Sequence, residues 1–208
     1  MIEIFSANTP NGKKISIMLE EIEYEYKVTR VDLDKGEQFK PDFKKISPLS
    51  KIPVIIDHKK NKTIFESGAI LIYLAEQSGM FYDQRERLEI NQWLMAQIGY
   101  VGPMLGQHHQ FHHYNPGKST FGEERYFKIS KRIYGELDER LSTSKFLSGD
   151  NYNISDISTF PWIARHQWHD IGLAKYKNLS RWYTEISKRD AVIKGFSFMN
   201  KNEVIPKP

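Results

Sequence analysis

Residues 47–75 read SPLSKIPVIIDHKKNKTIFESGAILIYLA, and this stretch decides the fold of the first part of the chain. Two short apolar runs, 53–56 and 63–65, flank the polar run HKKNK, which predicts two strands joined by a hairpin turn. A helix is expected to begin at Ser67, because the apolar residues that follow keep the three- and four-residue spacing of one helical face. These residues are Ile70, Leu71, Leu74 and Ala75.

The residues before this stretch predict two more strands and a helix. Ile2–Phe5 and Val28–Leu33 have the character of strands, and a helix is expected between them over residues 13–23. Its apolar face consists of Ile15, Met18, Leu19 and Ile22. A short helix or irregular segment is expected over residues 39–46. The order β-α-β-(α)-β-β-α predicts a compact α/β domain with a mixed sheet over residues 1–80.

From Arg85 onward the apolar spacing is helical, which predicts an all-α domain over residues 86–208. The strongest repeat consists of Tyr126, Ile129, Ile133, Leu137 and Leu141. Asn153 stands three residues before Asp156, a spacing typical of a capping box at a helix start. Pro161 is expected to kink that helix unless its neighbours compensate. The last eight residues, KNEVIPKP, have the composition of a loose tail.

The composition excludes several classes of protein. The 208 residues contain no cysteine, which excludes a disulfide scaffold, a thiolate zinc site, an iron–sulfur cluster and a cysteine nucleophile. The 30 basic and 26 acidic residues are interspersed along the chain, so we expect no nucleic-acid partner. The N-terminus lacks the apolar region of a signal peptide, and no apolar run approaches the ~20 residues that cross a bilayer. We therefore expect a soluble, cytoplasmic protein without a membrane partner.

Three segments of the 1–80 domain carry groups that could bind a ligand. The first, Thr9–Gly12, lies just before a predicted helix. The N-terminus of a helix favours an anion and lowers the pKa of a nearby thiol. Either Thr9 or Asn11 could donate a hydrogen bond to a thiolate there. A plain turn with Asn11 as the N-cap explains the same residues.

The other two segments stand at the head of a strand and of a helix. Pro53, preceded by Lys51 and Ile52, can form a cis peptide bond and leaves the preceding backbone free to pair with an extended peptide ligand. Glu66 can bind an ammonium group, while Ser67 and the helix N-terminus can bind a carboxylate. Helix capping alone also accounts for this last pair.

The run HHQFHH, residues 108–113, raises the question of a metal site. Its histidines would form two i,i+4 pairs on a helix, and such pairs can bind zinc. However, Gly102, Pro103 and Gly106 make a helix doubtful, and no carboxylate lies within the run. We therefore predict no metal, and favour a pocket wall or an interface in which the imidazoles satisfy one another.

Taken together, the three segments resemble the glutathione transferase superfamily, and the match runs along the whole chain. The pattern SPLSKIPV over residues 47–54, followed by FESGAI over residues 65–70 and Tyr73-Leu-Ala, is similar to the family's thioredoxin-like glutathione site. The resemblance implies a cis Pro53, a thioredoxin-like domain over residues 1–80 and an all-helical domain over residues 86–208. It also implies glutathione as the co-substrate.

Further motifs, TPNGKKI from Thr9, GEQF from Gly36 and GPMLGQ from Gly102, resemble the Nu class of the family. These enzymes are described as glutathione-dependent disulfide-bond oxidoreductases, with a fungal nitrogen regulator as a relative, and the resemblance implies a homodimer with sites near the subunit interface. Position 9 holds threonine where other classes keep Tyr, Ser or Cys, so stabilisation of the thiolate is assigned to Thr9 or Asn11. The implied glutathione contacts are Asn11, Gln38, Lys51, Ile52, Glu66, Ser67 and Arg132.

The resemblance implies a reaction in which one glutathione thiolate attacks a disulfide and a second glutathione resolves the mixed disulfide. Because the chain has no cysteine, both thiols would come from bound glutathione. Arg132, which is always charged, could hold the carboxylate of the second glutathione. Two alternatives stay open: a transferase that conjugates hydrophobic electrophiles, and a non-catalytic regulatory protein with the same fold.

Overall fold

The computed structural model describes all 208 residues, Met1 to Pro208. The chain divides into two compact units, one made of residues 1–83 and 189–204 and the other of residues 84–188 and 205–208. None of the helices combines the length and the apolar character that crossing a membrane requires.

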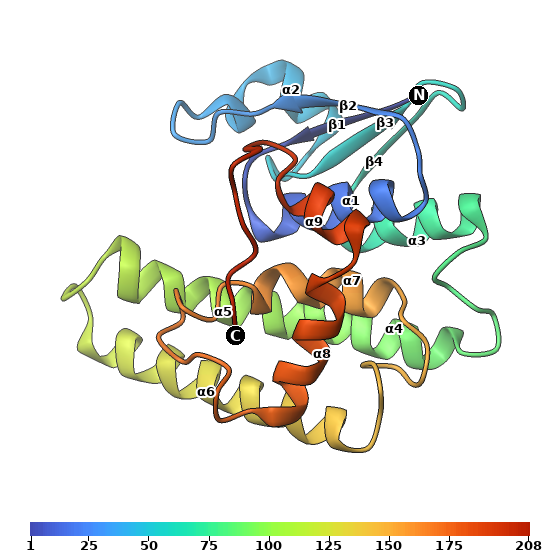
Figure 1. Cartoon of the computed structure of the whole chain (residues 1–208). Helices are drawn as coiled ribbons and strands as arrows, with labels where there is room; N and C mark the ends of the chain where they lie inside the picture. The colour runs from blue at the N-terminus through green and yellow to red at the C-terminus, as the bar shows by residue number, and fades with distance from the viewer. The chain divides into compact units, whose positions relative to one another are not determined.

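The first unit is built on a four-stranded mixed sheet of order β2-β1-β3-β4 (Figure 1). The strands are β1 (Ile2–Ser6), β2 (Tyr26–Arg30), β3 (Val54–Asp57) and β4 (Lys62–Phe65). β1 runs parallel to β2 and antiparallel to β3, which forms the predicted hairpin with β4. The predicted α/β order is therefore confirmed, although β2 begins two residues before the predicted start at Val28.

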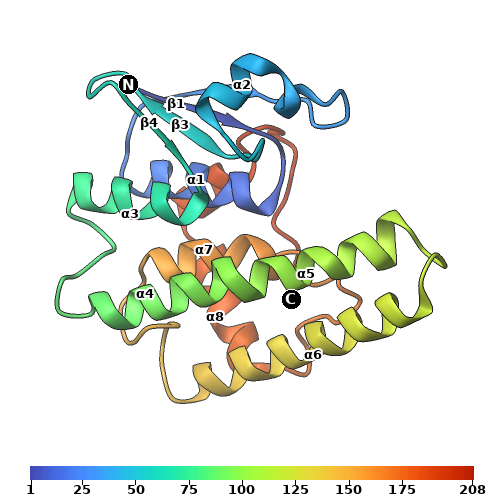
Figure 2. The same cartoon turned by 180° about the vertical axis from the view of Figure 1, so that it is seen from behind.

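Helices cover both faces of this sheet. α1 (Pro10–Glu21) and α3 (Ser67–Ser78) lie on one face, whereas α2 (Pro41–Ile46) lies on the other (Figures 1 and 2). A 3₁₀ turn, η1 (Glu37–Phe39), precedes α2. On the face of α2, Phe43 packs against Val31 and Val54 in one apolar cluster. The predicted apolar stripes of α1 and α3 are buried, which removes their side chains from water and stabilises both helices.

The C-terminal segment returns to the first unit. α9 (Asp190–Phe196) packs on α1 (Figure 1). Ser16 Oγ of α1 donates a 2.6 Å hydrogen bond to the carbonyl of Gly195 in α9. Further along, Glu203 forms an ion pair with Lys13 and accepts a 2.9 Å hydrogen bond from Asn8 Nδ2. Residues 189–204 therefore differ from the predicted organisation, in which they belonged to the helical domain and ended in a loose tail.

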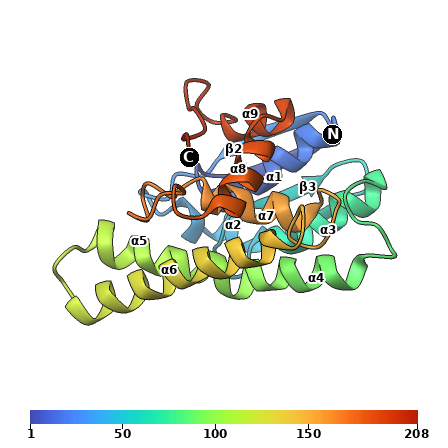
Figure 3. The same ribbon diagram turned by 60° about the horizontal axis from the view of Figure 1, so that its bottom comes forward.

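The second unit is helical throughout, and its longest stretch is an almost unbroken run from Arg87 to Tyr114 (Figure 3). This run consists of α4 (Arg87–Ala96), the π-helical turn η2 (Gln97–Val101), α5 (Gly102–His109) and a second π-helical turn, η3 (Gln110–Tyr114). α6 (Thr120–Ser142) turns back beside α5. The doubt about a helix at Gly102, Pro103 and Gly106 was wrong, because all three residues lie in α5. Pro103 comes just after the π-helical turn η2, and packing of α5 on α6 and α7 supports the helix.

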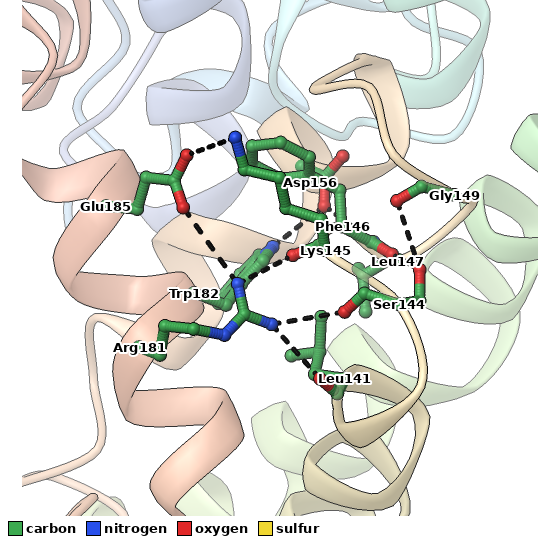
Figure 4. Close-up of polar contacts among 10 residues, drawn as sticks. All are labelled: Leu141, Ser144, Lys145, Phe146, Leu147, Gly149, Asp156, Arg181, Trp182 and Glu185. Atoms are coloured by element: carbon green, nitrogen blue, oxygen red, sulfur yellow. Dashed lines mark hydrogen bonds and ion pairs between the residues drawn. The ribbon is translucent and has the colours of Figure 1, made fainter.

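α7 (Ile154–Ile163) is buried along its whole length and continues through Pro161 in its last turn. Its N-terminus carries the predicted capping box: Asn153 Oδ1 accepts a 3.0 Å hydrogen bond from the amide of Ser155, and Asp156 Oδ2 accepts a 3.2 Å bond from the amide of Asn153. Asp156 Oδ1 also accepts hydrogen bonds from the Leu147 amide at 3.0 Å and from Trp182 Nε1 at 2.8 Å (Figure 4). Burial raises the pKa of Asp156 to about 6.

Trp182 belongs to α8 (Lys177–Ser187), so Asp156 links α8 to the loop before α7. The guanidinium of Arg181, one residue earlier, donates to the carbonyls of Leu141, Ser144 and Lys145 at 3.0, 3.1 and 3.0 Å (Figure 4). These bonds satisfy carbonyl groups at and after the C-terminus of α6, which have no intrahelical partner. Two sets of hydrogen bonds therefore hold the loop from α6 to α7 near α8: those that Arg181 donates directly, and those that Asp156 accepts from Leu147 and Trp182.

Candidate functional site

The strand register brings the three candidate ligand-binding segments to one end of the sheet. Val54 pairs with Phe5 on one side and with Phe65 on the other. The chain after β1, the chain before β3 and the chain after β4 therefore meet there. These segments carry Thr9 and Asn11, Lys51 and Ile52, and Glu66 and Ser67.

Thr9 is the N-cap of α1, which corrects the alternative that Asn11 caps this helix. Thr9 Oγ1 accepts a 3.1 Å hydrogen bond from the amide of Gly12, and Asn11 lies in the first turn. The cap uses a lone pair of the hydroxyl, so its proton can still be donated to a ligand. Gly12 permits close packing on the end of β1, since a Cβ atom there would lie 2.4 Å from Ser6 Oγ.

Glu66 and Ser67 form the start of α3. Glu66 is the N-cap and has a φ of 70° and a ψ of 117°, a conformation that residues other than glycine rarely adopt. Such a backbone costs on the order of 1–3 kcal/mol and is concentrated at ligand-binding sites. Ser67 is the first residue of the helix and is buried.

Lys14 is a residue of this region that reasoning from the sequence missed. Its side chain is only 1% exposed, and its Nζ atom donates a 3.2 Å hydrogen bond to Ser67 Oγ. Burial lowers the pKa of Lys14 to about 7, against the opposing effect of the Glu66 carboxylate. Because the ammonium group occupies a lone pair of Ser67 Oγ, the hydroxyl proton of Ser67 remains available for a ligand carboxylate. The signal was present in the sequence, since Lys14 stands four residues before Met18 on the buried face of α1.

The Ile52–Pro53 peptide bond is cis, as the family resemblance implies. Ser47 holds the backbone just before it, since Ser47 Oγ accepts a 3.0 Å hydrogen bond from the Lys51 amide and donates a 2.7 Å bond to the Lys51 carbonyl. The side chain of Lys51 is exposed. The backbone at Ile52 is thus anchored on its N-terminal side by a side chain of the same segment.

Gln38 and Arg132 complete the predicted contacts. Gln38 lies in η1, where Nε2 donates a long, 3.4 Å hydrogen bond to the Leu33 carbonyl while the buried Oε1 has no partner. Turning this amide toward a ligand would therefore cost only one weak hydrogen bond.

Arg132 belongs to α6 of the second unit. Its guanidinium donates a hydrogen bond to the Tyr100 hydroxyl, and its Nε atom lies 3.5 Å from Oε1 of Glu136. Its contact with glutathione stays a prediction.

Comparison with known proteins gives matches along most of the chain. The family model of the glutathione S-transferase N-terminal domain matches residues 2–76, and that of the C-terminal domain matches residues 119–190. The disulfide-bond oxidoreductase YfcG of Escherichia coli K12 is 45% identical over 198 residues, which cover 92% of both chains.

Two solved structures are similar throughout. A glutathione transferase from Burkholderia graminis, with two glutathione molecules bound per subunit, has a TM-score of 0.89 and 36% identity, covering 97% of this chain and 89% of that one. A glutathione transferase from Pseudomonas putida, with one glutathione disulfide bound per subunit, has a TM-score of 0.88 and 35% identity, covering 96% of this chain and 92% of that one.

Proposed function

This chain belongs to the glutathione S-transferase family, and on that premise we propose that it is a glutathione-dependent disulfide-bond oxidoreductase. One observation carries this proposal: the N-termini of α1, which Thr9 caps, and of α3, which begins at Ser67, lie at the same end of the sheet. The N-terminus of α3 suits a carboxylate and that of α1 suits a thiolate. The name of the E. coli relative and the glutathione disulfide in the P. putida structure agree with this activity.

The γ-glutamyl end of glutathione carries an ammonium and a carboxylate on one carbon, and we assign it to the start of α3. Glu66 would bind the ammonium group. Ser67, polarised by the buried ammonium of Lys14, would donate a hydrogen bond from its hydroxyl to the carboxylate. The backbone of Ile52 would pair with the cysteinyl part, and Lys51 would lie near the glycine carboxylate.

The cysteinyl thiol is then assigned to the start of α1. There the partial positive charge of the helix and a hydrogen bond from Thr9 or Asn11 lower the pKa of the thiol from about 8.5 toward neutrality. The thiolate attacks one sulfur of a disulfide RSSR, forms the mixed disulfide GSSR and releases RS⁻, which takes up a proton. A second glutathione thiolate attacks GSSR, so that two glutathiones are oxidised to GSSG and RSSR is reduced to two thiols.

Three further parts of the proposal come from the family resemblance. Arg132 is assigned to the carboxylate of the second glutathione, since a guanidinium binds carboxylates in a forked geometry. Gln38 is assigned to a glutathione contact after its amide turns. The enzyme is proposed to act as a homodimer in the cytoplasm, and light scattering coupled to gel filtration would measure its mass.

The test compares two reactions of the purified protein. Reduction of hydroxyethyl disulfide by glutathione is followed through glutathione reductase, and conjugation of glutathione to 1-chloro-2,4-dinitrobenzene is followed by absorbance. We expect fast disulfide reduction and negligible conjugation. The reverse pattern would indicate a conjugating transferase, and silence in both assays with retained glutathione binding would indicate a regulatory protein.

A second measurement addresses the mechanism directly. Titration of the thiol of bound glutathione, followed by the ultraviolet absorbance of the thiolate, should give a pKa well below the free value of about 8.5. A bound thiol that titrates like free glutathione would contradict the proposed mechanism.

A further inference from the structure

A cluster of imidazoles lies in the second unit, and it contains none of the residues assigned above to glutathione. His108 and His109 come from α5, His112 and His113 from η3, and His169 from the turn after α7. Their rings touch one another, with centroids 4.9 Å apart for His108 and His112 and 4.6 Å apart for His109 and His169. Asp170 brings a carboxylate to the same place, 3.0 Å from Nε2 of His112 and 3.7 Å from Nε2 of His113.

We propose that His108, His113 and Asp170 form a binding site for a divalent transition-metal ion of the zinc type. One potential ligand atom from each of the three residues lies within 4.8 Å of the others. Bonds of 2.0–2.1 Å in a tetrahedral site place ligand atoms roughly 3.4 Å apart, so small side-chain movements complete the geometry. Two imidazoles and one carboxylate form a donor set that suits zinc and leaves a fourth position for water.

The structure removes both reasons for which the sequence predicted no metal. The first was the doubtful helix, yet α5 and η3 run continuously through residues 102–114 and place His108 and His113 close together. The second was the lack of a carboxylate within the run, and Asp170 supplies one from a segment more than fifty residues later in the chain. Neither fact could be read from the local sequence.

His108 provides an independent observation. Its side chain is 0% exposed, and neither of its ring nitrogens has a hydrogen-bond partner. A buried polar atom without a partner costs on the order of 1–3 kcal/mol, and native structures contain few of them. A metal ion bound to one ring nitrogen would satisfy that nitrogen, which explains why an imidazole rather than an apolar side chain occupies this position.

Neighbouring groups hold the proposed ligands in place. The ring of His108 stacks on Phe127 with centroids 5.6 Å apart, and that of His113 stacks on Trp168 at 4.7 Å. Nε2 of His113 also contacts the carbonyl of Trp168. Contacts of this kind orient metal-binding imidazoles before the ion arrives. His113 and Asp170 are 25% and 49% exposed, so an ion can reach the site from solvent.

The test uses the full chain, freed of any affinity tag, equilibrated with Zn²⁺ and then desalted. We expect about one zinc per chain by plasma mass spectrometry, and a higher melting temperature with Zn²⁺ than with Mg²⁺. His113→Gln and Asp170→Asn should each weaken zinc binding at least about tenfold, because loss of even an indirect partner of a metal site has that effect.

His58→Gln is the matched control. His58 is an exposed histidine of the first unit that also pairs with a carboxylate, Glu3, at 3.0 Å, and its replacement should leave the zinc content unchanged. Circular dichroism without metal checks that each variant is folded, and Asp170→Asn decides the outcome where His113→Gln fails that check. Failure to retain zinc, or wild-type affinity in a folded Asp170→Asn variant, would overturn the proposed site. Zinc content is independent of disulfide reduction, so this outcome does not depend on the proposed enzyme activity.

Discussion

At the scale of single residues, Thr9 caps α1 and Asn11 does not, so substitutions of the two residues can show which of them donates to the thiolate. Thr9 caps α1, so Thr9→Ala should lower the free energy of unfolding by about 1 kcal/mol besides any effect on the thiolate. Asn11 is not the cap, so Asn11→Ala should leave the N-cap of α1 intact. If Asn11 donates to the thiolate, its loss removes about 1.5–3 kcal/mol, or roughly ten- to a hundredfold in the rate of disulfide reduction.

Steady-state kinetics and urea unfolding of both variants would measure these effects, and Thr9→Ser is the control that retains both the cap and the hydroxyl. Unchanged disulfide reduction in Asn11→Ala would remove this residue from the mechanism and leave Thr9 as the donor.

Lys14 predicts a pH dependence of glutathione binding. Its pKa is lowered to about 7, so it is charged below that pH and neutral above it. If its charge supports the carboxylate at Ser67, binding of S-methylglutathione, whose sulfur cannot ionise, should weaken as the pH rises from 6 to 8. Lys14→Met should bind the ligand several-fold more weakly at pH 6 and lose this dependence. Calorimetry at both pH values gives the comparison, and a pH slope that survives in Lys14→Met would show that another group is responsible.

At the scale of elements, the buried carboxylate of Asp156 joins α7 and α8. Asp156→Ala would leave the amides of Leu147 and Asn153 and the indole N–H of Trp182 without this acceptor. Each buried unsatisfied donor costs about 1–3 kcal/mol, so we expect a loss of at least about 3 kcal/mol in the free energy of unfolding. Urea denaturation measures it, and Asp156→Asn, which keeps one acceptor oxygen, should lose less. Equal losses in the two variants would contradict this account of the hydrogen bonds.

The elements themselves were predictable to the extent that local patterns determine them. The hairpin of β3 and β4, the apolar stripe of α3 and the capping box at Asn153 depend on residues close together in the sequence, and all three are confirmed. The path of the chain through residues 102–114 was misjudged, because glycine and proline weaken an isolated helix while tertiary packing sustains this one. Lys14 was missed because a lysine is normally exposed, whereas here a buried hydroxyl binds it.

At the scale of the whole chain, the sequence shows where helices lie but not which unit each one joins. The helical spacing from Arg85 onward predicted where the sheet ends and the helices that follow it begin. No local pattern indicated that residues 189–204 pack back on α1. That return depends on the fit of two surfaces distant in sequence, and Gly195 lies where they approach closely.

Gly195 allows α9 to lie against α1, and its replacement should break this contact. A Cβ atom at this position would lie 2.5 Å from the Cα of Ile17 and 2.6 Å from its backbone nitrogen, and the backbone of a buried helix cannot yield easily. Gly195→Ala should therefore destabilise the chain by about 1–3 kcal/mol, the range found for overpacked cores. The matched control is Gly135→Ala in α6, where nothing lies within 4 Å of the new methyl group. Because alanine is the better helix former, that variant should gain roughly 0.5–1 kcal/mol. Urea unfolding of both variants tests the packing, and equal stability changes in the two would contradict it.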